Sequence, residues 1–319
     1  MNWITRPLHV KWFTDQESIP LAITEVLTSS FMFWFGVTVA GLLLSAIFNQ
    51  RMVKIGWIGR LDNGLGGLKR YTVHILRLGL AIAIVLQLTE GAFLSPEFTA
   101  DAKWISIVLG AAVVALLFER TLWISGLSLL SLYVYSVAEY GLFHSLDYLF
   151  YLGIVYYLLT YRTIWKDSAI PVLYALTGLS FAWVGIEKLT MPSLAVDIIQ
   201  KFDVPTFGFS PENFVLIAAF IELGLAWTFI VGVLNRFVSI VVTIVFITTT
   251  TVFGYTEVVG HTILHTLLIM FIIQGGGAFK TPFEFHRKPW MRYLFVVVNF
   301  CVLLFGMMWI YIAMGSHGA

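Results

Sequence analysis

Apolar stretches long enough to cross a lipid bilayer recur along almost the whole of this sequence. The hydrocarbon layer of a membrane is about 30 Å thick, so a helix needs about 20 mainly apolar residues to cross it. The runs are continuous, whereas a membrane β-barrel would show alternating segments of about ten residues. The sequence therefore predicts an all-α polytopic membrane protein with about ten transmembrane helices. Their expected ranges are 24–48, 73–95, 103–118, 121–143, 146–160, 169–191, 213–233, 236–255, 257–274 and 292–314.

The composition agrees with a protein whose main partner is the lipid bilayer. Hydrophobic residues make up 59% of the 319 residues and charged residues 12%, with a mean hydropathy of +0.88. Soluble domains carry about 25% charged residues. A net charge of +1 gives no reason to expect nucleic acid as a partner. The single Cys301 allows neither an internal disulfide nor a pair of redox-active thiols.

The basic residues are distributed unequally between the two sets of predicted loops. Thirteen Lys and Arg residues follow the odd-numbered helices, five lie on the opposite side, and Arg77 falls inside a helix. Loops on the cytoplasmic side of a membrane carry the excess of Lys and Arg. The distribution therefore predicts that both termini are non-cytoplasmic.

The sequence contains a weak internal repeat. The segment Arg77–Pro96 resembles Ala175–Pro192, and Glu139 corresponds to Glu257 at an offset of 118 residues. Each repeated unit would contain four helices, an even number, so the two units would run in the same direction as a parallel repeat. We therefore divide the chain into an N-terminal tail with the first helix and a basic loop, a first four-helix unit, a second four-helix unit, and a C-terminal helix. These parts cover 1–72, 73–167, 168–282 and 283–319.

The second unit carries three short motifs that resemble a known family. They are "GLSFAWVGIEKLTMP" (Gly178–Pro192), "FIELGLAWTFIVGVLNR" (Phe220–Arg236) and "IIQGGGAFKTP" (Ile272–Pro282). In order and spacing they resemble the DoxX/DoxD-like integral membrane family, some members of which are membrane subunits of thiosulfate:quinone oxidoreductases. The resemblance implies a bacterial-type inner (plasma) membrane, a quinone, and an extracytoplasmic redox protein or subunit as partner.

One polar stripe stands out within the apolar sequence. In "EVVGHTILHTLL", Glu257, His261 and His265 are four residues apart, so they lie on one face of a helix. Ionisable groups inside a membrane are costly, and each is therefore a candidate functional group. The predicted topology places Glu187 at the depth of His261, and Glu222 at the depth of His265, in the outer half of the membrane.

This stripe has several interpretations. Two histidines four residues apart can bind one metal ion, so His261, His265, Glu187 and Glu222 could hold Cu, Fe or Zn. Alternatively, the two glutamates form buried polar contacts with the two histidines, with Lys188 neutralising a carboxylate. A third interpretation is proton or substrate gating. A haem would need ligands on opposite faces of the iron, and for that His144 would have to supply the second ligand.

The functional hypothesis combines this stripe with the family resemblance. We expect a membrane subunit of a quinone-linked oxidoreductase, in which Glu187, Glu222 and Glu257 serve as catalytic carboxylates of an outer-facing site. That site would hold a metal or take part in proton-coupled electron transfer to quinone. The alternatives are a transporter for a metal cation or proton, and a non-catalytic anchor or assembly subunit. The acidic surroundings argue against thiosulfate, because a dianion prefers arginines or helix N-termini.

Overall fold

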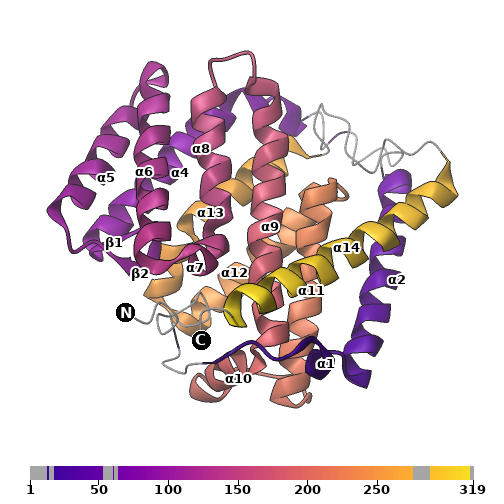
Figure 1. The fold of residues 1–319 in the computed structure, drawn as a ribbon. Coiled ribbons are helices and arrows are strands. Elements are labelled where there is room, and N and C mark those ends of the chain that lie inside the picture. Colours follow the sequence, from indigo (N-terminus) through magenta and orange to yellow (C-terminus); the bar gives the residue numbers. More distant parts are fainter. Residues whose placement is uncertain (1–12, 14–17, 53–59, 61–63, 276–287, 317–319) are drawn as a thin grey trace.

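The computed structural model describes residues 13, 18–52, 60, 64–275 and 288–316. Helices account for most of them (Figure 1). The ten main helices are α2 (Ser29–Met52), α4 (Thr72–Thr89), α5 (Lys103–Leu116), α6 (Leu122–Tyr140), α8 (Leu149–Thr160), α9 (Ala169–Thr190), α11 (Pro211–Val231), α12 (Asn235–Phe253), α13 (Tyr255–Gln274) and α14 (Pro289–Ser316).

Each predicted membrane helix has a counterpart among these ten. Within the described residues, nine helical segments are long and apolar enough to cross a membrane. The segment that contains α8 reaches the required length because it starts at Leu142 and includes α7 (Leu142–Ser145) and the 3-10 turn η4 (Leu146–Tyr148). The remaining helix, α5, is apolar but has only 14 residues. The all-α polytopic fold class is therefore confirmed.

The second helix ends earlier than predicted. We expected it to continue to residue 95, but α4 ends at Thr89, and a short antiparallel hairpin follows, formed by β1 (Ala92–Phe93) and β2 (Ser95–Thr99). Gly91 and Leu94 have positive φ angles of 63° and 58°, in the left-handed region that a continuing right-handed helix does not use. The apolar character of Ala92 to Leu94 comes from burial in this hairpin and not from membrane crossing.

A short helix lies between the sixth and seventh predicted helices, where the sequence predicted only a loop. Helix α10 (Pro192–Lys201) starts with a proline at its first position, which is favourable because the missing N–H has no partner there in any helix. One face, formed by Leu194, Ala195, Ile198 and Ile199, is buried against the bundle. The helix therefore covers one end of the second unit.

The helices of the two predicted units form two neighbouring groups, which we call the first and the second bundle. The first contains α4, α5, α6 and α8, the second α9, α11, α12 and α13, and in both each helix packs against the next in sequence. The bundles meet where α8 packs on α9 and α13 packs on α4. Within the first bundle, Gln87 of α4 donates a hydrogen bond to the Tyr151 hydroxyl of α8 at 2.9 Å. Within the second bundle, the Tyr174 ring of α9 stacks on the Phe271 ring of α13, with centroids 3.9 Å apart. This helix order is the one a parallel repeat requires; superposition of the units stays a prediction.

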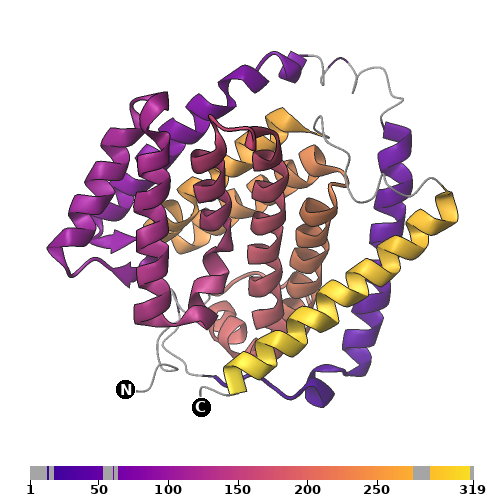
Figure 2. The same cartoon turned by 45° about the horizontal axis from the view of Figure 1, so that its top comes forward.

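The two flanking helices lie on the second unit. Helix α2 packs against α11, and α14 packs against α9 and α2. Figure 2 shows α14, in yellow, running obliquely across this side of the molecule. Among the described residues, the main contact of these two helices with the first unit is that of α14 with α7.

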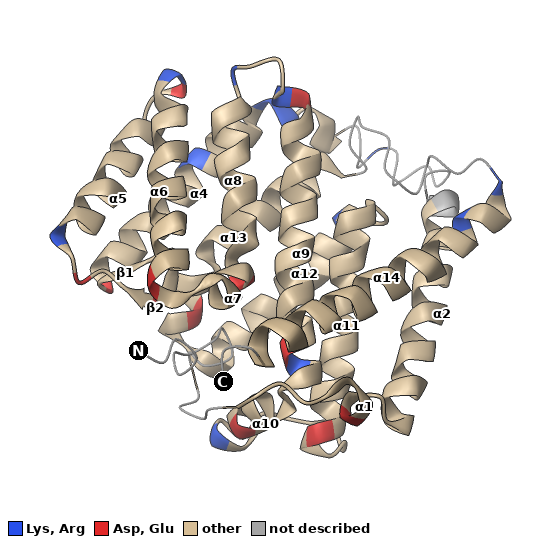
Figure 3. Ribbon diagram, in the orientation of Figure 1, with Lys and Arg blue, Asp and Glu red and all other residues tan. Residues whose placement is uncertain are grey.

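The charged residues divide between the two ends of the bundle (Figure 3). Lys69, Arg70, Arg120, Arg162 and Lys166 gather at the end where α4, α6 and α9 begin, which we call the basic end. The ribbon at the opposite end carries more of the Asp and Glu residues, and we call it the acidic end. The positive-inside rule predicts that the basic end is cytoplasmic.

Cysteine labelling checks this orientation. In a Cys301→Ser background, we expect a membrane-impermeant maleimide to label Ser193→Cys, at the exposed start of α10, in intact cells. Asp167→Cys, exposed before α9, should react only after the cells are lysed, because the membrane shields the basic end. Labelling of Asp167→Cys but not Ser193→Cys in intact cells would reverse the orientation.

Candidate functional site

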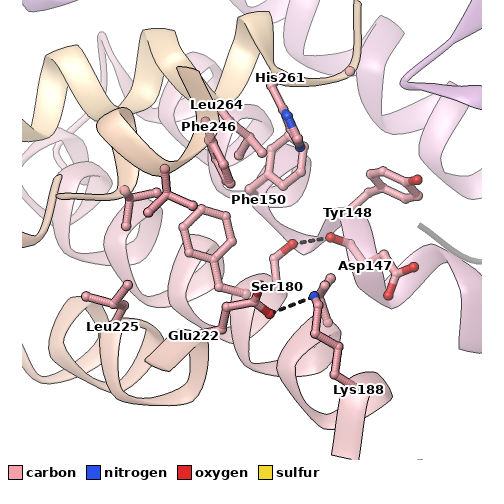
Figure 4. A pocket seen from close by; sticks show the side chains of 15 residues that line it. Asp147, Tyr148, Phe150, Ser180, Lys188, Glu222, Leu225, Phe246, His261 and Leu264 are labelled. Carbon is pink, nitrogen blue, oxygen red and sulfur yellow. Dashed lines mark hydrogen bonds and ion pairs between the residues drawn. The ribbon is translucent and has the colours of Figure 1, made fainter. Parts of the chain in front are cut away.

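A cavity of about 100 Å³ lies within the second unit. Helices α9, α11, α12 and α13 form most of its wall, and Asp147, Tyr148 and Phe150 contribute from the first unit (Figure 4). About 10–15 Å³ of such space is enough to hold one water. The space therefore admits several waters or part of a larger molecule.

The cavity wall is mostly apolar, with a few polar groups. Phe150, Phe181, Phe246 and Leu264 form much of the apolar surface. The polar side chains come from η4, α9, α11 and α13, and they are Asp147, Tyr148, Ser180, Lys188, Glu222 and His261. An apolar pocket with a small number of placed polar groups is typical of a small-molecule site.

His261 lies one helical turn after Glu257, near the start of α13. Their side chains are only 3% and 4% exposed, and the Nδ1 atom of His261 contacts the carboxylate of Glu257. Thr249 of α12 also donates to this carboxylate, at 3.4 Å. A carboxylate that contacts one ring nitrogen of a histidine orients the imidazole and stabilises its protonated form. The predicted stripe therefore provides a buried imidazole with a carboxylate behind it.

Phe246 of α12 fixes the plane of the His261 ring. The two rings are parallel, with an interplanar angle of 1° and centroids 4.3 Å apart. The same phenyl ring meets His265 edge to face at 5.9 Å. His265 is half-buried and does not line the cavity, so only one of the two predicted histidines faces it.

Glu222 lies at the cavity wall but does not pair with a histidine. Its carboxylate accepts a hydrogen bond from Nζ of Lys188 at 2.8 Å, which joins α11 to α9. The side chains are 37% and 17% exposed. The polar-packing interpretation expected Lys188 to neutralise a carboxylate, and Glu222 is the one it contacts.

Asp147 and Glu187 are both buried carboxylic residues near α14. Ser180 of α9 donates to the backbone carbonyl of Asp147, which ties η4 to α9. Both carboxylates are within electrostatic range of the buried Tyr311 hydroxyl of α14. Glu187 is fully buried and does not line the cavity, although it was predicted to share the level of His261.

The predicted haem ligand, His144, is in a different place. It belongs to α7, is 5% exposed, and meets the Phe143 ring edge to face at 5.6 Å. His144 does not line the cavity that contains His261.

The four predicted metal ligands do not form one set of donors. Glu222 pairs with Lys188, Glu187 lies toward Tyr311, and His261 contacts Glu257. Among the residues that the structure describes, no group of three or more His, Cys, Asp or Glu side chains could hold a metal ion. We therefore derive no step through a metal, and the metal site stays a prediction.

Several residues of the cavity carried no signal in the sequence. Phe246, Ser180 and Tyr148 belong to residue types that are common throughout the apolar helices. Asp147 was visible as an acidic residue at a helix end. Only the packing of η4 against α9 brings it to the cavity of the second unit.

Comparisons of the chain with models of protein families, with curated proteins and with solved structures found no match.

Proposed function

We propose that this chain is the membrane subunit of a quinone-linked oxidoreductase and that the cavity binds the quinone ring. One observation carries this proposal: a buried imidazole with a carboxylate behind it lines an apolar, aromatic cavity inside a membrane bundle. Such a cavity suits a ligand that is flat and apolar but exchanges protons.

The lining residues suit both properties of a quinone, its flat apolar ring and its hydrogen-bonding ring oxygens. Phe150, Phe181 and Phe246 offer aromatic surfaces against which a ring can pack. His261 provides a hydrogen-bonding group for a ring oxygen. The charged pair Lys188–Glu222 lies at the edge of the cavity and completes its polar groups.

His261 serves as the proton carrier in this proposal. Reduction of a quinone to a quinol consumes two electrons and two protons, and the reverse reaction releases them. The electrons would be exchanged with an extracytoplasmic redox protein or subunit. His261 passes protons to or from a ring oxygen one at a time, and the Glu257 carboxylate stabilises the imidazolium between transfers. Because Glu257 is the third residue of α13, protons reach this pair from the acidic end.

The packing between the cavity and the basic end favours this function over transport. Toward the basic end, Tyr174, Phe229 and Phe271 are all buried. Tyr174 stacks on Phe271 at 3.9 Å, and Phe229 lies 5.5 Å from the same ring. A path for a cation would have to cross this aromatic layer, which supports a site that opens toward the acidic half only.

Calorimetric titration of decylubiquinone into the protein in lipid nanodiscs tests the proposal. We expect saturable binding to one site, weakened by about tenfold or more in Val184→Phe, equal to about 1.4 kcal/mol, because the larger side chain fills the cavity. Val302→Phe on α14 is the matched control, since Val302 is 66% exposed on the outside of the bundle. Absence of saturable binding, or equal binding by Val184→Phe, would reject the proposal.

A further inference from the structure

We infer that the cavity opens sideways into the bilayer between α11 and α12, so that its ligand is an amphiphile that enters from the lipid. The ring end would occupy the cavity and the hydrocarbon tail would leave through the opening. The identity of the ligand as a quinone rests on the proposed function, whereas the position of the opening rests on burial and packing alone.

Burial of the lining residues shows which wall is open. The lining residues on α13 and η4 are shielded from the surroundings of the protein, since His261, Leu264 and Asp147 are each 5% exposed or less. On α12, Val245 lines the cavity and is nevertheless 44% exposed. On the facing side of α11, the Glu222 side chain is 37% exposed. Because these two residues face both the cavity and the outside of the bundle, the opening lies between their helices.

Packing gives an independent reason for an opening at this place. Helix α12 packs extensively against α13 but touches α11 only slightly, although α11 and α12 are neighbours in sequence. The turn of residues 232–234 holds them together at the basic end, where Gly232 and Leu234 both have positive φ angles. The rest of this boundary is the weakest between consecutive helices of the second unit.

The chemistry at the opening indicates the class of ligand. Lys188 lies two residues before the end of α9, so the Lys188–Glu222 pair lies near the membrane surface at the acidic end. The α12 surface beside it is apolar, with Ile244, Val245 and Ile247 exposed. A charged group near the surface beside an apolar face suits a molecule with a polar head and a hydrocarbon tail.

A second route from water has to be distinguished from this one. Another cavity, of about 320 Å³, lies between α1 (Ile23–Val26) and the start of α11, and Lys188 lines both cavities. A ligand from the water phase would pass through this outer cavity and around Lys188. Asn213 also lines the outer cavity, and its side chain is exposed.

Photolabelling from the lipid phase tests the opening. The full-length protein in phosphatidylcholine vesicles is irradiated with 3-trifluoromethyl-3-phenyldiazirine, a probe that partitions into the bilayer. Labels are then located by mass spectrometry on Leu264 and Phe150, which are 5% and 3% exposed and line the cavity. We expect both residues to be labelled in the wild type and labelling to fall several-fold in Val245→Trp, whose ring would close the opening.

Two variants control this experiment. Val252→Trp lies two turns further along the same face of α12, is 37% exposed and does not line the cavity, so labelling should equal the wild type. Asn213→Trp should also leave labelling unchanged. The inference is overturned if Val245→Trp, folded as judged by its melting temperature, is labelled like the wild type, or if Asn213→Trp removes labelling instead. Labelling needs no quinone, so failure of decylubiquinone binding alone would reject the proposed ligand and leave the opening in place.

Discussion

We expect replacement of His261 by glutamine to lower the proposed quinone turnover in isolated membranes by about 10²- to 10⁴-fold, the range that a positioned proton donor or acceptor contributes. Isolated membranes are the sample of choice because they would retain the redox partner that the proposed function requires. Glutamine keeps the size and hydrogen-bonding character of the side chain, but it cannot carry a proton at neutral pH. His261 lines the cavity and contacts Glu257, so a loss of this size would support its proposed role as the proton carrier.

His265→Gln is the matched control for this result. It changes the same residue type on the same helix, one turn away, at a position that does not line the cavity. We expect turnover close to the wild type, with unchanged binding of decylubiquinone. Equal losses in both variants would show that the effect comes from disturbed packing around Phe246, which contacts both rings. Full turnover in His261→Gln would remove this residue from the mechanism.

The membrane helices were predictable because one physical quantity sets them. A bilayer of fixed thickness requires long apolar runs, and each of the ten predicted runs overlaps one of the main helices. The structure departs from the predicted helices where apolar residues are buried by protein and not by lipid. The hairpin at Ala92–Phe93 and the buried face of α10 are of this kind, and composition does not distinguish the two environments.

The polar contacts were predictable only within one helix. Helical pitch fixes the spacing of Glu257 and His261, and their side chains are indeed in contact. Contacts between helices depend also on how each helix is rotated about its axis and on which helices are neighbours. Depth alone paired Glu222 with His265, but the rotation of α9 and α11 brings Glu222 to Lys188. For the same reason Glu187, adjacent in sequence to Lys188, does not line the cavity and is within electrostatic range of Tyr311.

Helices α9 and α11 approach each other closely, and a substitution at this contact is expected to have a large effect on the stability of the protein. Gly178→Ala should destabilise the protein by about 1–3 kcal/mol, the usual cost of overpacking a well-packed core. A Cβ atom at this position would lie 2.7 Å from the backbone oxygen of Ala226 and 2.6 Å from Cγ1 of Ile230. Rotation of a side chain cannot relieve a contact with the backbone, so α11 itself has to move. Small residues at such interfaces are what allow membrane helices to pack closely.

The same change tests whether the cavity depends on this packing. Displacement of α11 from α9 would also pull Glu222 from Lys188, which lie 2.8 Å apart on these two helices. We therefore expect Gly178→Ala to lower both the melting temperature in detergent and the affinity for decylubiquinone. Gly110→Ala in α5 is the control, because no atom lies within 4 Å of the added Cβ there, and alanine favours the helix. A Gly178→Ala protein as stable as Gly110→Ala would mean that α9 and α11 are not packed at this distance, and the walls of the cavity would have to be drawn differently.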